Sequence, residues 1–333
     1  MSSDDMTAHG PAEGPTESPF DGGLSADPLV TAVIPTVGRP CLREAVRSAL
    51  RQTVPTMPLV VVDDLDALAV VQSRLTGLEY RLVCTAGRQG AGAARNLGVQ
   101  FAETPWVAFL DDDDDWVAEK SEAQIRLSPA APEQDGRRPA EGTAMSCRAL
   151  LVGASTRAVP ERPYSTQRGA DGVLAPGVVG YVLDRSTVRL RRNFLQTSTL
   201  LCPRETALDV PWDDSLNRHQ DWDWLIRLES AGVRIETIPD ILVRVHQGSV
   251  GSVSRSLDWQ GSRAWLDSLA VEVPAAARAD FLASVVARGA LASRAWSRGI
   301  RELASGLRAG AHPAALLVGL SGMAAPRLPV HHG

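Results

Sequence analysis

The chain has 333 residues, a formal net charge of −5 and four widely spaced cysteines. Six of its acidic residues lie within residues 1–28, which contain no lysine or arginine, so removing them leaves the body at +1. A body this close to neutral argues against a nucleic-acid-binding protein, which needs a concentrated basic face. The cysteines include no C-x-x-C pair, which argues against a zinc site and against a disulfide scaffold.

Neither end of the chain predicts a targeting or membrane-spanning segment. Residues 1–28 are rich in Asp, Gly, Pro and Ser and lack the basic start and apolar centre of a signal peptide. We predict that they form a disordered leader. The longest weakly polar stretch, residues 314–325, is too short for a transmembrane helix, which needs about 20 residues. We therefore expect a cytoplasmic protein.

From residue 29 onward, short apolar runs alternate with longer segments of helical period. This pattern is typical of βα units and predicts an α/β fold with a mostly parallel central sheet flanked by helices. The first part of the pattern is regular, and Pro40 suits the first turn of its first helix. In chain order, we predict a strand at 29–34, a helix at 40–52, strands at 59–62 and 81–84, a helix at 90–101 and a strand at 106–110.

The second part of the pattern is less regular. We predict loops at 128–142 and 157–177, strands at 143–152 and 197–201, a helix at 221–231 and β-rich stretches at 233–238 and 241–245. Beyond Leu257 the chain is rich in Ala, Arg and Leu with helical periodicity. The predicted organisation is therefore a leader (1–28), one domain (29–256) and a C-terminal helical extension (257–333).

The segment WVAFLDDDDDW, residues 106–116, is an apolar strand that ends in five consecutive aspartates. In open α/β sheets, ligands bind in the crevice beyond the carboxyl ends of the strands. Mn²⁺ or Mg²⁺ prefers one or two carboxylates together with substrate phosphates. We therefore predict Asp111 and Asp113 as metal ligands, with Asp111 and Asp112 also near the bound phosphates. The alternative is a solvated acidic turn, because runs of like charge are usually exposed.

Polar residues also follow the first two predicted strands. Pro35, Thr36 and Arg39 follow the first strand, and Asp63 and Asp64 follow the second. Three strands therefore deliver polar groups to one edge of the sheet, which favours a ligand site there. Either aspartate could accept a hydrogen bond from a nucleotide base, although an ordinary cap at the strand end is the simpler interpretation.

Residues 90–96, GAGAARN, open a predicted helix but are not a dinucleotide fingerprint. Arg95 replaces the third glycine of that motif, and the segment follows the third strand, not the first. The glycines indicate close backbone approach, with Arg95 reaching a phosphate or ribose and Asn96 beside it. A tight contact between helix and sheet is the alternative.

Two further residues could carry chemistry. Asp221 lies at the start of the helix in HQDWDWLIRL and is a candidate general base, because a helix N-terminus keeps a carboxylate ionised. It could also serve only as an N-cap. His246, in VRVHQGS, could bind the metal or a diphosphate, although a lone histidine is more often structural.

Taken in order, these segments resemble the family-2 glycosyltransferases of the GT-A fold. The matching motifs are VIPTVGRP, VVVDD, GAGAARNLG, FLDDDDDW and HQDWDWLIRL. The resemblance covers residues 29–256, with 128–193 poorly matched. It departs from the family at Leu65 and Asp66, where Gly-Ser is usual, and the run of five aspartates leaves the register of the Asp-x-Asp motif open by one residue.

The resemblance implies a nucleotide-sugar donor, with a UDP-sugar favoured, bound by residues 29–116 through a Mn²⁺ or Mg²⁺ ion. Residues 117–256 would form the acceptor side, where Asp221 deprotonates a hydroxyl of a glycan, glycolipid or small molecule. Transfer would then invert the anomeric configuration. The rival interpretation is a degenerate GT-A module that binds nucleotide or glycan without catalysis. A sugar-1-phosphate nucleotidyltransferase is less favoured, because the first loop is not rich in lysine and glycine.

The C-terminal extension carries five arginines among alanines and leucines: Arg288, Arg294, Arg298, Arg301 and Arg308. Such helices could pack on the domain or lie on an anionic membrane surface, which would suit a lipid-linked acceptor. We favour packing, and peripheral membrane contact stays open as a hypothesis.

Overall fold

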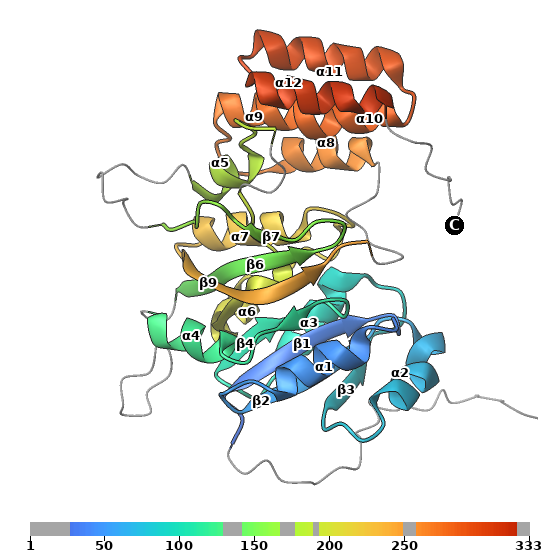
Figure 1. Ribbon diagram of the computed structural model, residues 1–333, viewed down its shortest axis with the longest axis vertical. Helices are drawn as coiled ribbons and strands as arrows, with labels where there is room; N and C mark the ends of the chain where they lie inside the picture. The colour runs from blue at the N-terminus through green and yellow to red at the C-terminus, as the bar shows by residue number, and fades with distance from the viewer. Residues whose placement is uncertain (1–26, 129–141, 167–176, 189–192, 249–257, 325–333) are drawn as a thin grey trace, which may run out of the picture.

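The computed structural model describes residues 27–128, 142–166, 177–188, 193–248 and 258–324. Figure 1 shows an α/β body with the C-terminal helices stacked at one end of it. The predicted disordered leader, the loop at 128–142 and part of the irregular stretch at 157–177 lie outside the described residues.

The first half of the body forms the parallel part of the sheet. Its elements are β1 (Val30–Thr36), α1 (Leu42–Leu50), β2 (Thr56–Val62), α2 (Leu68–Leu75), β3 (Arg81–Cys84), α3 (Ala91–Phe101) and β4 (Trp106–Phe109). The strands lie in the order β3-β2-β1-β4, and each neighbouring pair is parallel. Their Val- and Ile-rich sequences are buried on both faces, as parallel strands covered by helices require. The strands and helices predicted here are confirmed, with ends that shift by a few residues.

The second half extends the sheet beyond β4. Its elements are β5 (Asp115–Trp116), α4 (Lys120–Leu127), β6 (Thr143–Val152), β7 (Arg157–Val159), α5 (Gly177–Leu183), β8 (Leu201–Pro203), α6 (Arg204–Asp209), α7 (Gln220–Ser230) and β9 (Arg234–His246). β8 is antiparallel to both β4 and β6, whereas β6 and β9 run parallel.

Two strand predictions in this half need correction. The strand predicted at 197–201 is wrong: Thr197–Thr199 form a 3₁₀ turn, which the Gln196 side chain caps by accepting a hydrogen bond from Ser198 N–H. The two β-rich stretches at 233–238 and 241–245 are a single strand, β9. Pro239 lies between them, where the register against β6 shifts, because proline cannot donate a hydrogen bond to the neighbouring strand.

The sheet separates two hydrophobic cores. On one side, α1, α2 and α4 cover the side chains of Val30, Ala32 and Ile34. On the other side, α3, α5 and α7 cover Val33, and the same core continues into the C-terminal helices through Trp265 and other side chains. Successive side chains of β1 therefore point to opposite faces of the sheet, and each face is covered by its own set of helices.

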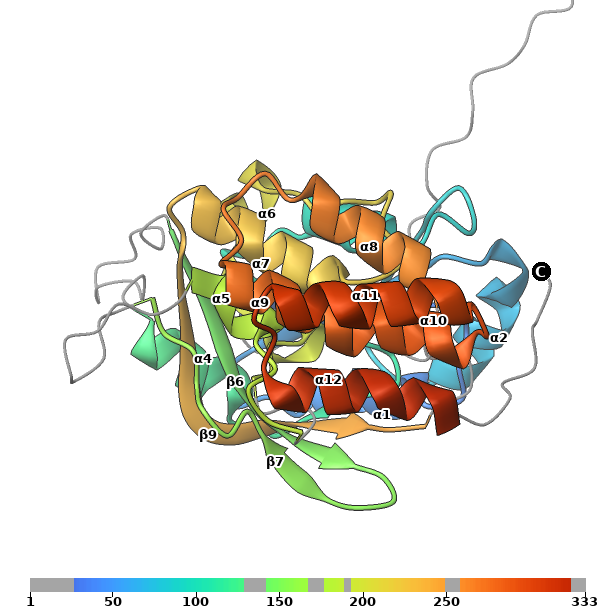
Figure 2. The same ribbon diagram turned by 90° about the horizontal axis from the view of Figure 1, so that it is seen from above.

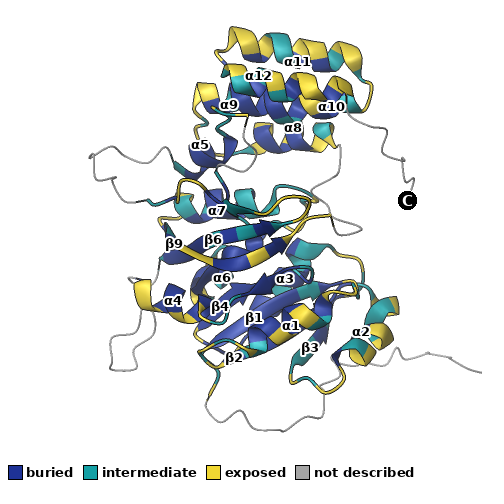
Figure 3. Ribbon diagram, viewed as in Figure 1, coloured by how far each residue is buried: buried dark blue, intermediate teal, exposed yellow. Residues whose placement is uncertain are grey.

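The C-terminal extension is a bundle of α8 (Trp259–Ser268), α9 (Ala275–Phe281), a π-helical segment (Leu282–Ala287), α10 (Arg288–Ala292), α11 (Trp296–Arg308) and α12 (Pro313–Leu320). Figure 2 shows α11 and α12 on the outer side of the bundle, and Figure 3 shows that their outer surfaces are largely exposed. No helix in the described ranges is long and apolar enough to cross a membrane. The predicted packing on the domain is confirmed for α8, α9 and the π-helical segment, whose side chains share the second core. α11 and α12 pack on the π-helical segment instead.

Gly98 explains why the glycine-rich segment must pack closely on the sheet. A Cβ at this position would lie 2.3 Å from Val33 Cγ1, and Val33 is fully buried. We expect Gly98→Ala to lower the free energy of unfolding by about 1 to 3 kcal/mol, because overpacking outweighs the better helix propensity of alanine. Urea unfolding will measure this change. Ser73→Ala, at an exposed position on α2, is the control, and an unchanged stability of Gly98→Ala would contradict the close contact.

Candidate active site

A cleft of about 760 Å³ opens at the carboxyl ends of β1, β2 and β4. Its other wall is formed by the residues after α5, the start of α7 and the end of β9. The predicted site residues that line it are Pro35, Thr36, Arg39, Asp63, Arg95, Asp111, Asp112, Asp113, Asp221 and His246. Asp64 and Asn96 do not line it.

The five aspartates after β4 differ in environment, and Asp112 points toward β1. Thr36 Oγ1 donates to Asp112 Oδ2 at 2.5 Å, and Arg39 Nη1 lies 3.0 Å from Asp112 Oδ1. Burial raises the pKa of Asp112 to about 6, although the Thr36 hydroxyl and the Arg39 charge oppose the shift. Thr36 and Arg39 therefore hold the aspartate segment against the end of β1.

Asp111 and Asp113 are the more exposed carboxylates of the segment. Their side chains are 27% and 14% exposed, compared with 4% for Asp112. Asp111 accepts hydrogen bonds from Arg95 at 2.8 Å and from Gln196 at 3.0 Å, and Asp113 lies 3.3 Å from Arg39. These two carboxylates lie on the cleft wall where a cation could reach them.

Asp114 shows that the segment carries an excess of negative charge. It is buried and accepts hydrogen bonds from the Ser198 hydroxyl at 2.6 Å and from His246 N–H at 3.1 Å. Burial, and then the charges of Asp111 and Asp113, raise its pKa well above the ordinary value. A carboxylate-rich wall of this kind fits a hard divalent cation, which prefers oxygen ligands.

His246 is oriented by the last aspartate of the run. Its Nε2 lies 2.7 Å from Asp115 Oδ2, and Arg244 binds the other oxygen of Asp115 at 2.7 Å. Because this contact uses Nε2, only Nδ1 of His246 could face a metal or a phosphate. An imidazole held by a carboxylate in this way is typical of an oriented metal ligand, and equally of a structural contact.

The two aspartates after β2 shape the loop that precedes α3. Asp63 accepts hydrogen bonds from the Thr85 hydroxyl at 2.7 Å and from the N–H groups of Gln89 and Gly90 at 2.9 and 2.8 Å. Asp64 caps a short 3₁₀ helix and pairs with Arg88. Asp63 therefore borders the cleft, but both of its carboxylate oxygens already accept hydrogen bonds from the protein. Asp64 acts as an ordinary cap after the strand, which was the simpler of the two interpretations of its sequence position.

Arg95 and Asn96 organise the site from α3. Arg95 is buried, pairs with Asp111, donates to Gln220 Oε1 at 2.8 Å and stacks 4.7 Å above the Trp212 ring. Asn96 exchanges two hydrogen bonds of 2.8 Å with the backbone of Trp212. Arg95 thus contacts a carboxylate of the site, whereas Asn96 faces away from the cleft and fixes the neighbouring loop.

Asp221 faces the aspartates from the opposite wall. The cap of α7 is His219, in the left-handed region at φ 62°, so the alternative that Asp221 serves only as the N-cap does not hold. The carboxylate is partly buried and accepts a hydrogen bond from Trp222 N–H at 3.0 Å. Burial raises the pKa of Asp221 to about 6, with the charge of Arg95 opposing and that of Asp111 adding to the shift. The Asp221 carboxyl group therefore titrates closer to neutral pH than an ordinary aspartate does.

His219, the N-cap of α7, is also a titratable residue. Burial lowers its pKa to about 3, and its ring stacks on Trp265 with 4.6 Å between centroids. Its Nε2 lies 3.0 Å from the Ser262 hydroxyl of α8. His219 stays neutral at physiological pH and joins the cleft to the C-terminal bundle.

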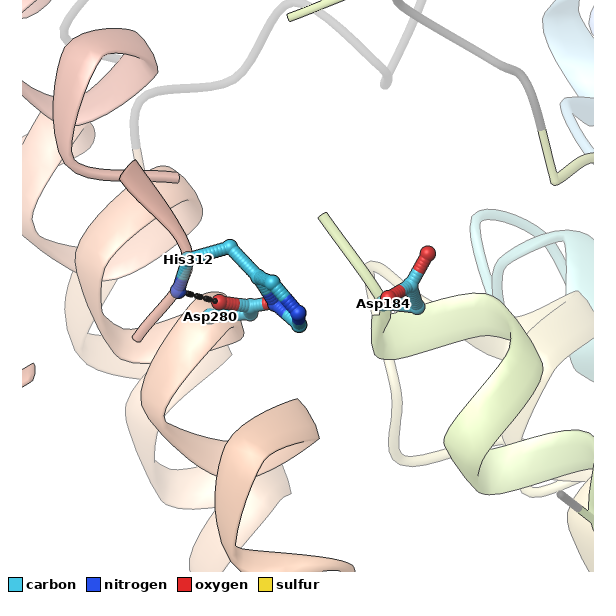
Figure 4. A group of neighbouring side chains, drawn as sticks. All are labelled: Asp184, Asp280 and His312. Atoms are coloured by element: carbon cyan, nitrogen blue, oxygen red, sulfur yellow. Dashed lines mark hydrogen bonds and ion pairs between the residues drawn. The ribbon is translucent and has the colours of Figure 1, made fainter. Parts of the chain in front are cut away.

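Several residues in or beside the cleft carry no signal in the sequence. Gln196 and Ser198 come from the misassigned 3₁₀ turn and bind Asp111 and Asp114 across more than 80 positions of sequence. Asp184 lies after α5, where its ligand atoms, with those of Asp280 and His312, fall within 4.8 Å of one another. Figure 4 shows Asp280 and His312 joined in the bundle, with Asp184 opposite. The hydrogen bond to Asp280 raises the pKa of His312.

Solved structures that resemble this chain share its fold. S. aureus TarS in complex with UDP-GlcNAc aligns with a TM-score of 0.54 and 15% identity, over 89% of this chain and 87% of that one. The mannosyltransferase PcManGT from Pyrobaculum calidifontis, in complex with GDP-Man and Mn²⁺, aligns with a TM-score of 0.50 and 18% identity, over 92% and 84% of the two chains. At these identities the likeness concerns the GT-A fold alone.

Sequence comparisons reach the same family. Residues 31–130 match the profile described as Glycosyl transferase family 2. The amylovoran biosynthesis glycosyltransferase AmsB of Erwinia amylovora is 27% identical over 225 residues, which cover 66% of this chain and 69% of AmsB. The UDP-Glc:alpha-D-GlcNAc-diphosphoundecaprenol beta-1,3-glucosyltransferase WfgD of Escherichia coli is 32% identical over 30% of this chain, a match that spans 41% of WfgD. Residues 31–130 therefore form a glycosyltransferase family 2 segment, and the chain is a glycosyltransferase of the GT-A fold.

Proposed function

We propose that this glycosyltransferase moves a sugar from a nucleotide-sugar donor to an acceptor hydroxyl with inversion of configuration. The observation that carries the proposal is the single cleft in which Asp221 faces the carboxylates of Asp111 and Asp113. Residues 29–116 would bind the donor, and residues 117–256 would form the acceptor side.

The donor is proposed to be a UDP-sugar held with Mn²⁺ or Mg²⁺. Support comes from WfgD, whose name gives UDP-Glc, and from TarS, which was crystallised with UDP-GlcNAc. PcManGT, crystallised with GDP-Man and Mn²⁺, supports a divalent cation. Asp111 and Asp113 would hold the ion, with His246 as a further ligand. When bound, the cation would offset the charge that develops on the leaving diphosphate.

Asp221 is proposed to perform the proton transfer. Its carboxylate would accept the proton of the acceptor hydroxyl while that oxygen bonds to the anomeric carbon. The bond from the anomeric carbon to the donor diphosphate would break on the opposite face, which inverts the configuration. A pKa of about 6 keeps Asp221 mostly ionised at neutral pH and still basic enough to take the proton.

Thermal unfolding with nucleotides tests the donor site. We expect UDP to raise the unfolding temperature in the presence of Mn²⁺ and not in the presence of chelator, with GDP and TDP giving smaller shifts. A ligand that binds only the folded state at 100 times its Kd adds about 2.7 kcal/mol of stability. A folded protein that shows no shift with any nucleotide would contradict the donor site and favour the degenerate module.

The acceptor is proposed to be a glycolipid reached at a membrane surface. The acceptor in the name of WfgD is linked to diphosphoundecaprenol. α11, α12 and the 3₁₀ turn that follows α12 carry exposed apolar side chains: Trp296, Ile300, Leu307, Leu317, Leu320 and Met323. Between residues 293 and 324 there are four arginines and one carboxylate, Glu302, which is buried and paired. An apolar strip beside a local excess of arginines suits anionic lipid.

Vesicle pelleting tests the membrane contact. We expect the full chain to pellet with phosphatidylglycerol vesicles at low salt, and Ile300→Ser with Leu307→Ser to lower the bound fraction several-fold. Val70→Ser, at an exposed apolar position on α2, is the matched control. Failure of the full chain to pellet would contradict the membrane contact. Self-association of the protein through the same apolar strip would instead assign the strip to an interface with a second copy of the chain. The cytoplasmic location expected from the sequence stays a prediction.

A further inference from the structure

Two arginines lie on the wall of the cleft that also carries Asp221. Arg185 follows the end of α5, and Arg218 lies three residues before Asp221. The opposite wall, with its aspartates and Arg39, is the one proposed to bind the cation and the donor. These two arginines therefore lie on the acceptor side without a role in the proposed transfer.

Arg185 is held in the cleft without an anionic partner for its side chain. It is partly buried, and within the described ranges its guanidinium makes no hydrogen bond or ion pair. Only its backbone N–H is bonded, to Asp280 Oδ2 at 2.8 Å. Asp280 is already occupied by His312, through the N–H and Nδ1 of that residue, both at 2.7 Å (Figure 4). Partial burial of an unpaired guanidinium costs free energy, which a bound anion would recover.

Arg218 and Arg288 add positive charge to the same end of the cleft. Burial lowers the pKa of both Arg185 and Arg218. The charges of Asp184 and Asp280 oppose this shift at Arg185 and that of Asp258 opposes it at Arg218, whereas the charge of Arg288 adds to it by a smaller amount at each. Arg288 is exposed on α10 of the C-terminal bundle. Arg185 and Arg218 therefore line the same cleft from segments that are far apart in the chain, and the charge of Arg288 on a third segment acts on both.

We infer that Arg185 and Arg218 bind a phosphate or diphosphate group of the acceptor substrate. The inference rests on the proposed function, because it supposes that the hydroxyl presented to Asp221 belongs to the same acceptor. Two guanidinium groups match phosphate oxygens in geometry and charge. A neutral glycan would leave Arg185 without a partner, whereas a sugar carried on a diphosphate would satisfy it.

Calorimetric titration of the full chain with inorganic pyrophosphate tests the site. The titration is made in chelator, so that the metal-dependent donor wall does not hold the probe. We expect Arg185→Gln and Arg218→Gln each to weaken pyrophosphate binding about tenfold or more, because each removes charge-assisted hydrogen bonds. Arg185→Lys keeps the charge but lacks the planar guanidinium group, so its affinity for pyrophosphate should lie between those of the wild type and Arg185→Gln. Arg301→Gln, which removes an exposed arginine of α11, is the charge-matched control.

The outcomes separate this inference from the proposed function. Failure of folded wild-type protein to bind pyrophosphate, or binding that both glutamine variants leave unchanged, overturns the inference even where UDP with Mn²⁺ still stabilises the protein. If UDP with Mn²⁺ does not raise the unfolding temperature, the proposed function is overturned. The pyrophosphate site is then judged by the calorimetric titration alone. Loss of phosphatidylglycerol vesicle binding in these variants, with pyrophosphate binding intact, assigns the arginines to a phospholipid headgroup and also overturns the inference.

Discussion

Replacing Asp221 with asparagine is expected to lower kcat about 10²- to 10⁴-fold, the usual contribution of a general base. Asparagine keeps the shape and the hydrogen bond from Trp222 N–H but cannot take a proton. Nucleotide binding should survive, because the donor wall of the cleft is untouched. Steady-state transfer assays with each nucleotide-sugar, paired with the UDP thermal shift, will measure the two effects separately.

The pH dependence of the wild-type enzyme follows from the same carboxylate. Asp221 acts only when it is ionised, and its pKa is raised to about 6, so kcat should fall as the pH drops below about 6. Stability changes in the opposite sense. A carboxyl group whose pKa is raised by folding stabilises the fold below its ordinary pKa, and that contribution is lost as the pH rises through about 6. Asp221→Asn should therefore be no less stable than the wild type at pH 7.5.

These expectations separate the enzyme from a degenerate binding module. If Asp221→Asn transfers sugar as fast as the wild type, Asp221 is not the catalytic base. If neither the wild type nor the variant transfers sugar while UDP still raises the unfolding temperature, the degenerate binding module is favoured. Asp214→Asn is the matched control, because Asp214 is exposed and lies outside the cleft. Its activity should equal that of the wild type.

The sequence predicts the donor half of the molecule well because its signals are local. β1, β2 and β4 are short buried runs of branched residues, and the polar residues that end them must meet at one edge of a parallel sheet. The segment before β8 gives no such signal: its Thr and Ser residues have strand propensity, but the Gln196 side chain closes a 3₁₀ turn instead. A capping contact of this kind overrides a weak local preference.

The acceptor wall could not be predicted because it is assembled from distant segments. Arg185, Arg218 and Arg288 become neighbours only after α7 and the C-terminal bundle pack on the same core. Asp64 and Asn96 illustrate the opposite difficulty. Each stands beside a residue that lines the cleft, yet each is turned away to bind a loop, and sequence position alone does not give the direction of a side chain.

Replacing Asp113 with asparagine is expected to abolish metal-dependent transfer and the Mn²⁺-dependent part of the UDP shift. A neutral amide is a poor ligand for a divalent cation that brings the donor diphosphate with it. Asp112→Asn is the isosteric comparison: Asp112 is buried against Thr36 and Arg39, so its variant should keep the response to Mn²⁺. Both can be measured by Mn²⁺ titration at fixed UDP.

The pair of variants also decides the register of the five aspartates. If the ion is held by Asp111 and Asp113, whose side chains are the more exposed, only the Asp113 variant loses its response to metal. The opposite pattern would move the site to Asp112 and Asp114, which requires both buried carboxyls to turn away from Thr36 and Ser198. That rearrangement would break the Thr36 and Ser198 hydrogen bonds, and the free energy of the broken contacts is the reason to expect the first pattern.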